Sequence, residues 1–194
     1  MPLSLLRAVP LIVIAVVVAA CGGDDRPGRT DIAQVDAVIE VVQAQDRDGL
    51  RDLLQFQSLP CADTIGAGGP PRCLGEPAGT NVDVFQASQC EPAWWRRDDV
   101  DRLLDEVIAL EPALYAAFET PEAFYLEGRY AAVFEGDDPR IDEAGLKRYL
   151  AVGVEGTTGL ITGIALGCGI DEPVHFLLPH RDSGFDDWLI EPPD

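Results

Sequence analysis

The densest group of side chains that could bind a ligand is the run Trp94, Trp95, Arg96 and Arg97. Adjacent indoles and guanidiniums can stack on sugars, peptides or aromatic ligands. Neighbouring residues of an extended chain point to opposite sides, so we expect one tryptophan to lie in the core and the other to be available for binding. Trp94, Trp95 and Arg96 are therefore the candidate ligand contacts.

Acid–base catalysis would depend on His175 and His180, the only histidines of the chain. His175 lies between Val174 and Phe176 in a predicted strand, and His180 follows in a loop near Asp182. A histidine beside a carboxylate can transfer protons, but an isolated one is more often structural. The motifs GxSxG, SxxK and HExxH are absent from the sequence. We therefore predict no catalytic residues, and an enzyme that uses His180 or His175 with a nearby carboxylate is the alternative.

Acidic side chains gather in two predicted turns, as a calcium site would require. The first turn spans residues 135–143, and the second contains Asp171 and Glu172. The spacing departs from the EF-hand pattern, and Pro139 interrupts the first turn. A solvated acidic surface is the commoner meaning of such clusters, so we predict no metal and no cofactor.

The cysteines favour disulfides. Four of them follow Cys21, namely Cys61, Cys73, Cys90 and Cys168, and they allow three pairings. We favour Cys61 with Cys73, which bracket a loop rich in glycine and proline, and Cys90 with Cys168. A zinc site is the alternative, but there is no CxxC pair and the histidines lie far along the chain.

The amino terminus has the pattern of an export signal. Arg7 is its only charge, and an apolar stretch over residues 8–20 ends at Cys21. Such a stretch is too short to span a bilayer as a helix, which needs about 20 residues. The segment Val18–Cys21, VAAC, resembles the lipobox of bacterial lipoprotein precursors. This resemblance implies cleavage before Cys21 and attachment of diacylglycerol to its thiol; an ordinary secretory signal is the alternative.

Length and charge limit the remaining functions. The chain has 194 residues, 34 acidic side chains against 14 basic ones and a formal net charge of −20. Such an acidic chain is unsuited to binding nucleic acid or an anionic lipid surface by electrostatics. We expect residues 1–20 to be a signal peptide, 21–30 a lipidated cysteine with a flexible tether, and 31–194 a single domain outside the cytoplasmic membrane.

Hydrophobic periodicity places helices before strands. Helices are predicted to begin at Asp31 and Asp46 as N-caps and after Asp98 or Asp99, and Pro112 is expected to start a further helical turn. A loop is predicted over 58–80. The predicted strands span 81–86, 124–134, 146–154, 159–166, 174–178 and 185–190, the last as an edge strand carrying Trp188.

This order predicts an α+β fold, with N-terminal amphipathic helices packed on a curved, mainly antiparallel C-terminal sheet and two disulfides stapling it. The segment VDAVIEVVQAQDRDGLRDLL, residues 35–54, is similar to the paired first helices of the NTF2-like and SnoaL-like superfamily. The segment AVGVEGTTGLITGIALG, residues 151–167, resembles its late hairpin. The resemblance implies a cone-shaped fold, but no catalytic Asp and His pair of that superfamily can be matched here.

Location and motifs together predict a lipid-anchored protein of the bacterial cell envelope. We expect it to bind a small ligand or a protein partner rather than to catalyse a reaction. The alternatives are a SnoaL-like enzyme or hydrolase and a purely structural accessory subunit.

Overall fold

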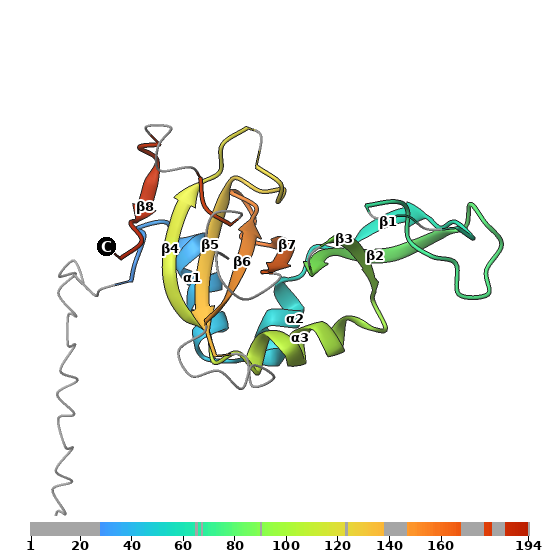
Figure 1. Ribbon diagram of the computed structural model, residues 1–194, viewed down its shortest axis with the longest axis horizontal. Coiled ribbons are helices and arrows are strands. Elements are labelled where there is room, and N and C mark those ends of the chain that lie inside the picture. Colours follow the sequence, from blue (N-terminus) through green and yellow to red (C-terminus); the bar gives the residue numbers. More distant parts are fainter. Residues whose placement is uncertain are drawn as a thin grey trace, which may run out of the picture.

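The computed structural model describes residues 28–64, 66, 68–89, 91–122, 124–137, 147–167, 177–179 and 185–193. This part of the chain is an α+β fold with three helices and an eight-stranded sheet (Figure 1). The helices are α1 (Ala33–Gln43), α2 (Arg47–Leu53) and α3 (Val100–Ile108). The strands are β1 (Gln57–Pro60), β2 (Asn81–Gln89), β3 (Glu91–Arg96), β4 (Ala113–Glu119), β5 (Tyr130–Gly136), β6 (Arg148–Val154), β7 (Ile161–Leu166) and β8 (Trp188–Ile190).

The first helix buries the predicted face but begins differently. Ile32, not Asp31, is the N-cap residue, and its side chain makes no capping bond. The Asp36 carboxylate instead accepts hydrogen bonds from the Thr30 amide at 2.7 Å and the Thr30 hydroxyl at 2.8 Å. The predicted Asp31 cap is wrong because a carboxylate inside the helix binds the preceding segment. The buried face consists of Val35, Val38, Ile39 and Val42, as predicted.

The second and third helices start at their predicted places. The Asp46 carboxylate caps α2 by accepting from the Gly49 amide at 3.0 Å. Asp99 precedes α3 without a side-chain capping bond. An ion pair of 2.7 Å between Arg51 and Asp101 joins the two helices. The short helix α2 is thus fixed at its start by its own cap and along its side by α3.

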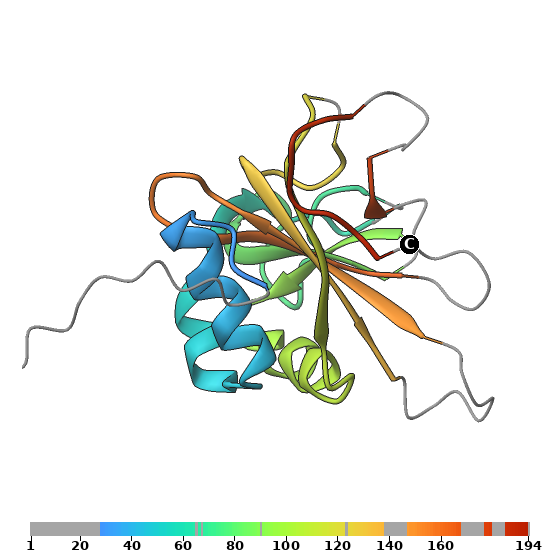
Figure 2. The same ribbon diagram turned by 90° about the vertical axis from the view of Figure 1, so that its left-hand side faces the viewer.

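The sheet has the strand order β1-β2-β7-β6-β5-β4-β8, and β3 pairs with β2 off this path. The β2–β7 pair is parallel, and the other pairs are antiparallel. The helices pack on one side, as Figure 2 shows, where Phe85, Phe134 and Ile164 meet α1 and α3 in the main core. On the other side, Phe118 contacts the rings of Phe185 and Trp188 in T-shaped geometry.

Three predictions about the strands and the sheet are wrong. The segment after Pro112 is not a helical turn, because β4 pairs along β5 from Ala113 opposite Glu135 to Glu119 opposite Tyr130. This long-range pairing overrides the local preference of proline for a helix start. The strand predicted from residue 124 begins only at Tyr130. The sheet also takes strands from the first half of the chain, so it is not confined to the C-terminal half.

The other predicted elements have mixed outcomes. The loop predicted over 58–80 is wrong at its start, because β1 continues to Pro60 and pairs with β2. The short strand predicted at 81–86 is present within β2, with Val82 and Val84 buried. The edge strand that carries Trp188 is present as β8. Residues 174–176 of the predicted strand 174–178 are outside the described part, as is the whole signal segment with Cys21. The described Leu177 and Leu178 are not in a strand, so this prediction is wrong at its end. No helix within the described ranges is long and apolar enough to cross a membrane.

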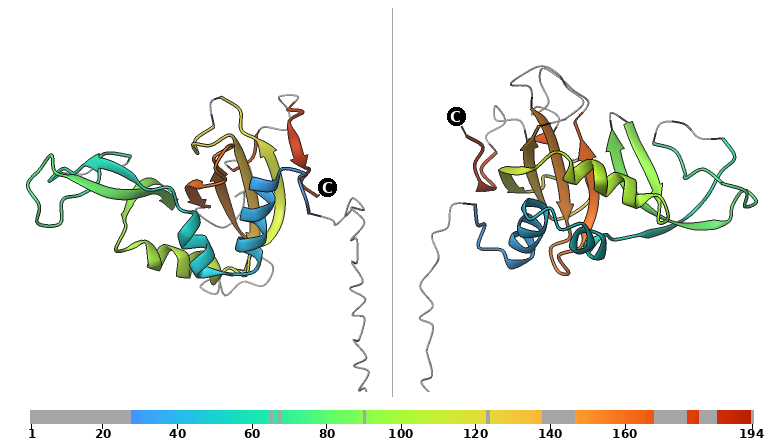
Figure 3. Two further views of the ribbon diagram at one scale, coloured as in Figure 1. Left: turned by 180° about the vertical axis from the view of Figure 1, so that it is seen from behind. Right: turned by 90° about the horizontal axis from the view of Figure 1, so that it is seen from below.

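Strands β1 and β2 extend as an arm away from the rest of the sheet, and the loop 61–80 forms its end (Figures 1 and 3). The predicted disulfide between Cys61 and Cys73 is present in this loop, with an S–S distance of 2.03 Å. Cys90 and Cys168 lie outside the described residues. One of the two predicted disulfides is therefore confirmed, and the other stays a prediction.

Candidate binding site at the edge of strand β3

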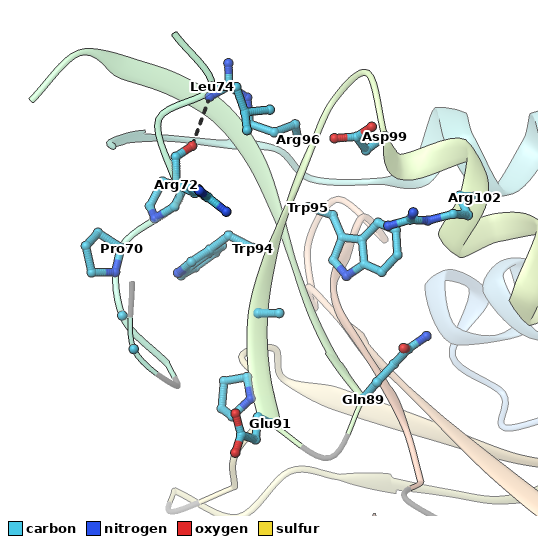
Figure 4. Close-up of a pocket in the computed structure, with 15 residues that line it drawn as sticks. Pro70, Arg72, Leu74, Gln89, Glu91, Trp94, Trp95, Arg96, Asp99 and Arg102 are labelled. Atoms are coloured by element: carbon cyan, nitrogen blue, oxygen red, sulfur yellow. Dashed lines mark hydrogen bonds between the residues drawn. The ribbon is translucent and has the colours of Figure 1, made fainter. Parts of the chain in front are cut away.

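A pocket of about 650 Å³ lies where the arm meets the body of the protein (Figure 4). It is lined by the glycine- and proline-rich part of the arm loop, by β3 and by the first turn of α3. Trp94, Trp95 and Arg96, the candidate ligand contacts, all line it. Strand β3 therefore brings the three predicted residues to one site.

The two indoles sit on opposite faces of β3 because they are neighbours in a strand. Trp94 packs against the small apolar cluster of Cys61, Val82 and Val84, whereas Trp95 packs against the main core. Both rings are half-buried. The predicted alternation is confirmed, but each tryptophan has a cluster of its own, so neither is simply core or simply exposed.

This alternation locates the pocket relative to the strand. Side chains on opposite faces of a strand can line the same pocket only if that pocket lies along an edge of the strand. One edge of β3 is occupied by its pairing with β2. The pocket therefore lies along the other edge, between β3 and the arm loop.

The guanidinium of Arg96 is engaged in holding the arm loop. It forms an ion pair with Glu76 and donates to the Arg72 carbonyl oxygen at 3.5 Å, the bond drawn in Figure 4. The other carboxylate oxygen of Glu76 accepts from the Leu74 amide at 2.7 Å. The hydrogen-bonded guanidinium of Arg96, with help from backbone amides, lowers the pKa of Glu76 to about 2. Arg96 thus shapes the wall of the pocket as well as lining it.

Two further arginines supply charge that is not neutralised locally. Arg72 and Arg102 line the pocket, and no carboxylate pairs with either of them among the residues that the structure describes. The central guanidinium carbon of Arg102 lies 4.9 Å from the centroid of the Trp95 ring. In Figure 4, Arg72 lies on the side of Trp94, whereas Arg102 lies beside Trp95. Sequence reasoning missed both, because neither is adjacent to the tryptophans in the chain.

Arg97 belongs to a different environment. Its guanidinium lies 3.8 Å from the centroid of the Phe56 ring and 3.4 Å from a carboxylate oxygen of Asp83. It does not line the pocket. The tetrapeptide that the sequence singled out is therefore divided between two sites.

The other candidate residues are not brought to this pocket by the described chain. His175, His180, Cys21, Cys90 and Cys168 lie outside the described residues, so the enzymatic alternative stays a prediction. Most of the acidic cluster at 135–143 also lies outside, and the described Asp137 pairs with Lys147 at 2.8 Å. Within the described ranges, no group of three or more His, Cys, Asp or Glu is placed to hold a metal ion.

Comparisons with known proteins do not assign a family. The chain matches no protein-family model and no curated protein. Among solved structures, it is similar to a Mycobacterium tuberculosis protein whose X-ray crystal structure was determined in complex with estradiol-17beta-hemisuccinate. That match has a TM-score of 0.32 and 16% sequence identity, and it covers 71% of this chain and 92% of the other. At these values it supports neither a shared family nor a shared ligand.

Proposed function

We propose that this chain is a lipid-anchored binding protein of the bacterial cell envelope, and that the pocket at the edge of β3 takes its ligand or protein partner. The observation that carries the proposal is the composition of the pocket. Two indoles meet there with the guanidiniums of Arg72 and Arg102, which have no carboxylate ion-pair partner among the described residues, in a chain with a formal net charge of −20. Indoles and guanidiniums are the side chains most enriched where proteins bind one another tightly.

Two features support a location outside the cytoplasmic membrane. The segment VAAC at 18–21 has the lipobox pattern, and the disulfide between Cys61 and Cys73 is typical of an oxidising compartment. Two acyl chains on Cys21 would hold the protein stably at the membrane, whereas one chain gives only marginal binding. The acidic domain itself would be repelled by anionic lipid, so the anchor must supply the attachment.

We also propose the second disulfide, between Cys90 and Cys168. Gln89 and Leu166 are paired in register at the ends of β2 and β7. Cys90 follows the first of these residues directly, and Cys168 comes two positions after the second. This closeness of the two strand ends supports the pairing. Peptide mapping without reduction should find the Cys90 and Cys168 peptides cross-linked to each other.

Membership of the NTF2-like superfamily remains part of this proposal. The helices α1 and α2 and the hairpin β6–β7 stand at the two segments on which the resemblance rests. This agreement supports the resemblance in element order alone. It brings no catalytic residue with it.

The proposal is tested by mass spectrometry of the protein purified from its own membranes. Denaturing spectra should show acylated Cys21 and two disulfides, and native spectra should show a retained small molecule or protein. The double variant Trp94→Ala, Arg102→Gln should lose what is retained, whereas Arg97→Gln, outside the pocket, should keep it. An unmodified Cys21 with the signal removed would overturn the anchoring, and equal retention by both variants would overturn the site.

A further inference from the structure

We propose that the pocket is a site of strand addition, in which an extended segment of a partner protein with acidic side chains pairs its backbone with Trp94 at the free edge of β3. This inference rests on the proposed binding function and specifies the chemistry of the partner. It follows from the hydrogen-bond register of β3, from the groups left over at its edge, and from the positions of two arginines.

The register fixes which backbone groups of β3 face away from β2. In an antiparallel pair, residues that exchange hydrogen bonds alternate with residues whose N–H and C=O groups point outward. The Arg97 amide donates to the Asp83 carbonyl at 3.2 Å, so these two residues form a bonded pair. The unbroken register then makes Trp95 bond to Phe85 and leaves the backbone groups of Trp94 pointing away from β2.

The other edge of β2 gives an independent check of this alternation. The Cys61 amide donates to the Thr80 carbonyl at 2.9 Å, so even-numbered residues of β2 face β1. The backbone groups of the odd-numbered residues of β2 therefore form hydrogen bonds with β3.

Two outward groups of β3 already have partners within the chain. The Pro92 carbonyl accepts from the Gly68 amide at 3.2 Å, and proline has no N–H to satisfy. The Arg96 carbonyl accepts from the Asp99 amide at 2.9 Å. In the described part of the chain, the N–H and C=O of Trp94 and the N–H of Arg96 have no such partner. One residue of an added strand can bond to both groups of Trp94.

The two arginines match the alternation of an added strand. Consecutive side chains of a strand point to opposite faces of the sheet. Arg72 lies on the Trp94 side of β3, and Arg102 lies on the Trp95 side (Figure 4). Two adjacent acidic residues of the added segment would therefore reach one guanidinium each. A charge-assisted pair with each arginine would add orientation as well as affinity.

The dimensions of the site suit a short segment. Its volume of about 650 Å³ is within the range of sites that enclose a small ligand or a few residues. Leu74, with 63% of its surface exposed, stands on the lining of the pocket. It offers an apolar contact to an aliphatic side chain of the added segment. Two carboxylates also line the pocket: Glu91 lies at the far end from Arg72 in Figure 4, and Asp99 lies on the side of Arg96 and Arg102.

The test uses the capped peptide acetyl-Thr-Val-Glu-Asp-Val-Thr-amide and the protein lacking its signal and lipid, in a Trp188→Phe background so that Trp94 and Trp95 report binding by fluorescence. A series of peptides carries one N-methylated amide each. Methylation of the one amide that donates to the Trp94 carbonyl should weaken binding about tenfold or more, and methylation at the two flanking positions should not, because only alternate amides of a strand face its neighbour. A version with Gln-Asn at the centre should also bind at least tenfold more weakly.

The protein variants separate this idea from the broader binding function. Arg72→Gln and Arg102→Gln should each weaken binding of the acidic peptide, whereas Arg97→Gln should not. Strand addition is overturned if no methylated position binds more weakly than its two neighbours, or if the peptide fails to bind at millimolar concentration. The wild type could still retain a ligand from the membrane that the pocket variants lose. In that case the proposed binding function would hold although strand addition would not.

Discussion

Arg102 stacks on Trp95, with its central guanidinium carbon 4.9 Å from the ring centroid, and so joins the first turn of α3 to β3. Such contacts at exposed sites contribute about 0.5 to 1 kcal/mol. We expect Arg102→Gln to lower the free energy of unfolding by about that amount and Arg102→Lys to lower it less, because the cation is retained. Urea denaturation followed by Trp fluorescence measures both. Equal losses in the two variants would show that the cation does not matter.

Several features of the fold could be predicted from local patterns. The buried face of α1 follows from apolar residues at helical spacing, and the Cys61–Cys73 pair follows from a loop that has few other constraints. The segment Ala113–Glu119 could not be assigned in this way. Its strand depends on pairing with β5, the next strand of the chain, and Pro112 gave a local signal for a helix.

Only part of the site could be predicted from local patterns in the sequence. Trp94 and Trp95 attract attention because they are adjacent and aromatic. Arg72 reaches them from the arm loop and Arg102 from α3, and only the β2–β3 pairing and the packing of α3 place the four side chains together. The sequence also grouped Arg97 with the tryptophans, although its guanidinium lies over Phe56. Adjacent residues of a strand point to opposite faces of the sheet, so adjacency in the sequence does not predict that two side chains share a site.

The disulfide should contribute strongly to the stability of the arm. Cys61 and Cys73 are 12 residues apart, and closing a loop of that length is expected to stabilise the folded protein by about 3 kcal/mol. We expect the double variant Cys61→Ser, Cys73→Ser to lose about that much and to be cleaved faster by protease within 61–80. Urea denaturation and timed proteolysis are the measurements. If the unfolding free energy and the cleavage rate are both unchanged in the double variant, the disulfide does not constrain the arm loop.

The ion pair of Glu76 with Arg96 should make stability depend on acid pH. The pKa of Glu76 in the folded protein is about 2, below its ordinary value of 4.5. A depressed carboxyl pKa means that the contribution is complete above about pH 4.5 and is lost as the pH falls from there through about 2. The difference in urea midpoint between the wild type and Glu76→Gln should therefore be present at pH 6 and shrink toward pH 2.

A matched control for this dependence is Glu91→Gln, since Glu91 also lines the pocket but has no ion pair within the described residues. Its difference from the wild type should stay small across the same range. Carbon-13 NMR of the Glu76 carboxyl would give the titration midpoint directly. A midpoint near the ordinary value would contradict the ion pair.

Gly136 should tolerate no side chain, because the end of β5 lies against the turn that follows α3. A Cβ there would overlap the carbonyl oxygen of Leu110 and lie 2.9 Å from its Cβ, while the Leu110 carbonyl also accepts from the Asp137 amide at 3.0 Å. Overpacking of this kind costs about 1 to 3 kcal/mol, so Gly136→Ala should lower the unfolding free energy by that amount. Gly66→Ala is the control, since nothing lies within 4 Å of a Cβ at that position and its effect should be below about 0.5 kcal/mol. Chemical denaturation of both variants measures the difference, and equal stabilities would mean that α3 and β5 do not meet as closely as this contact requires.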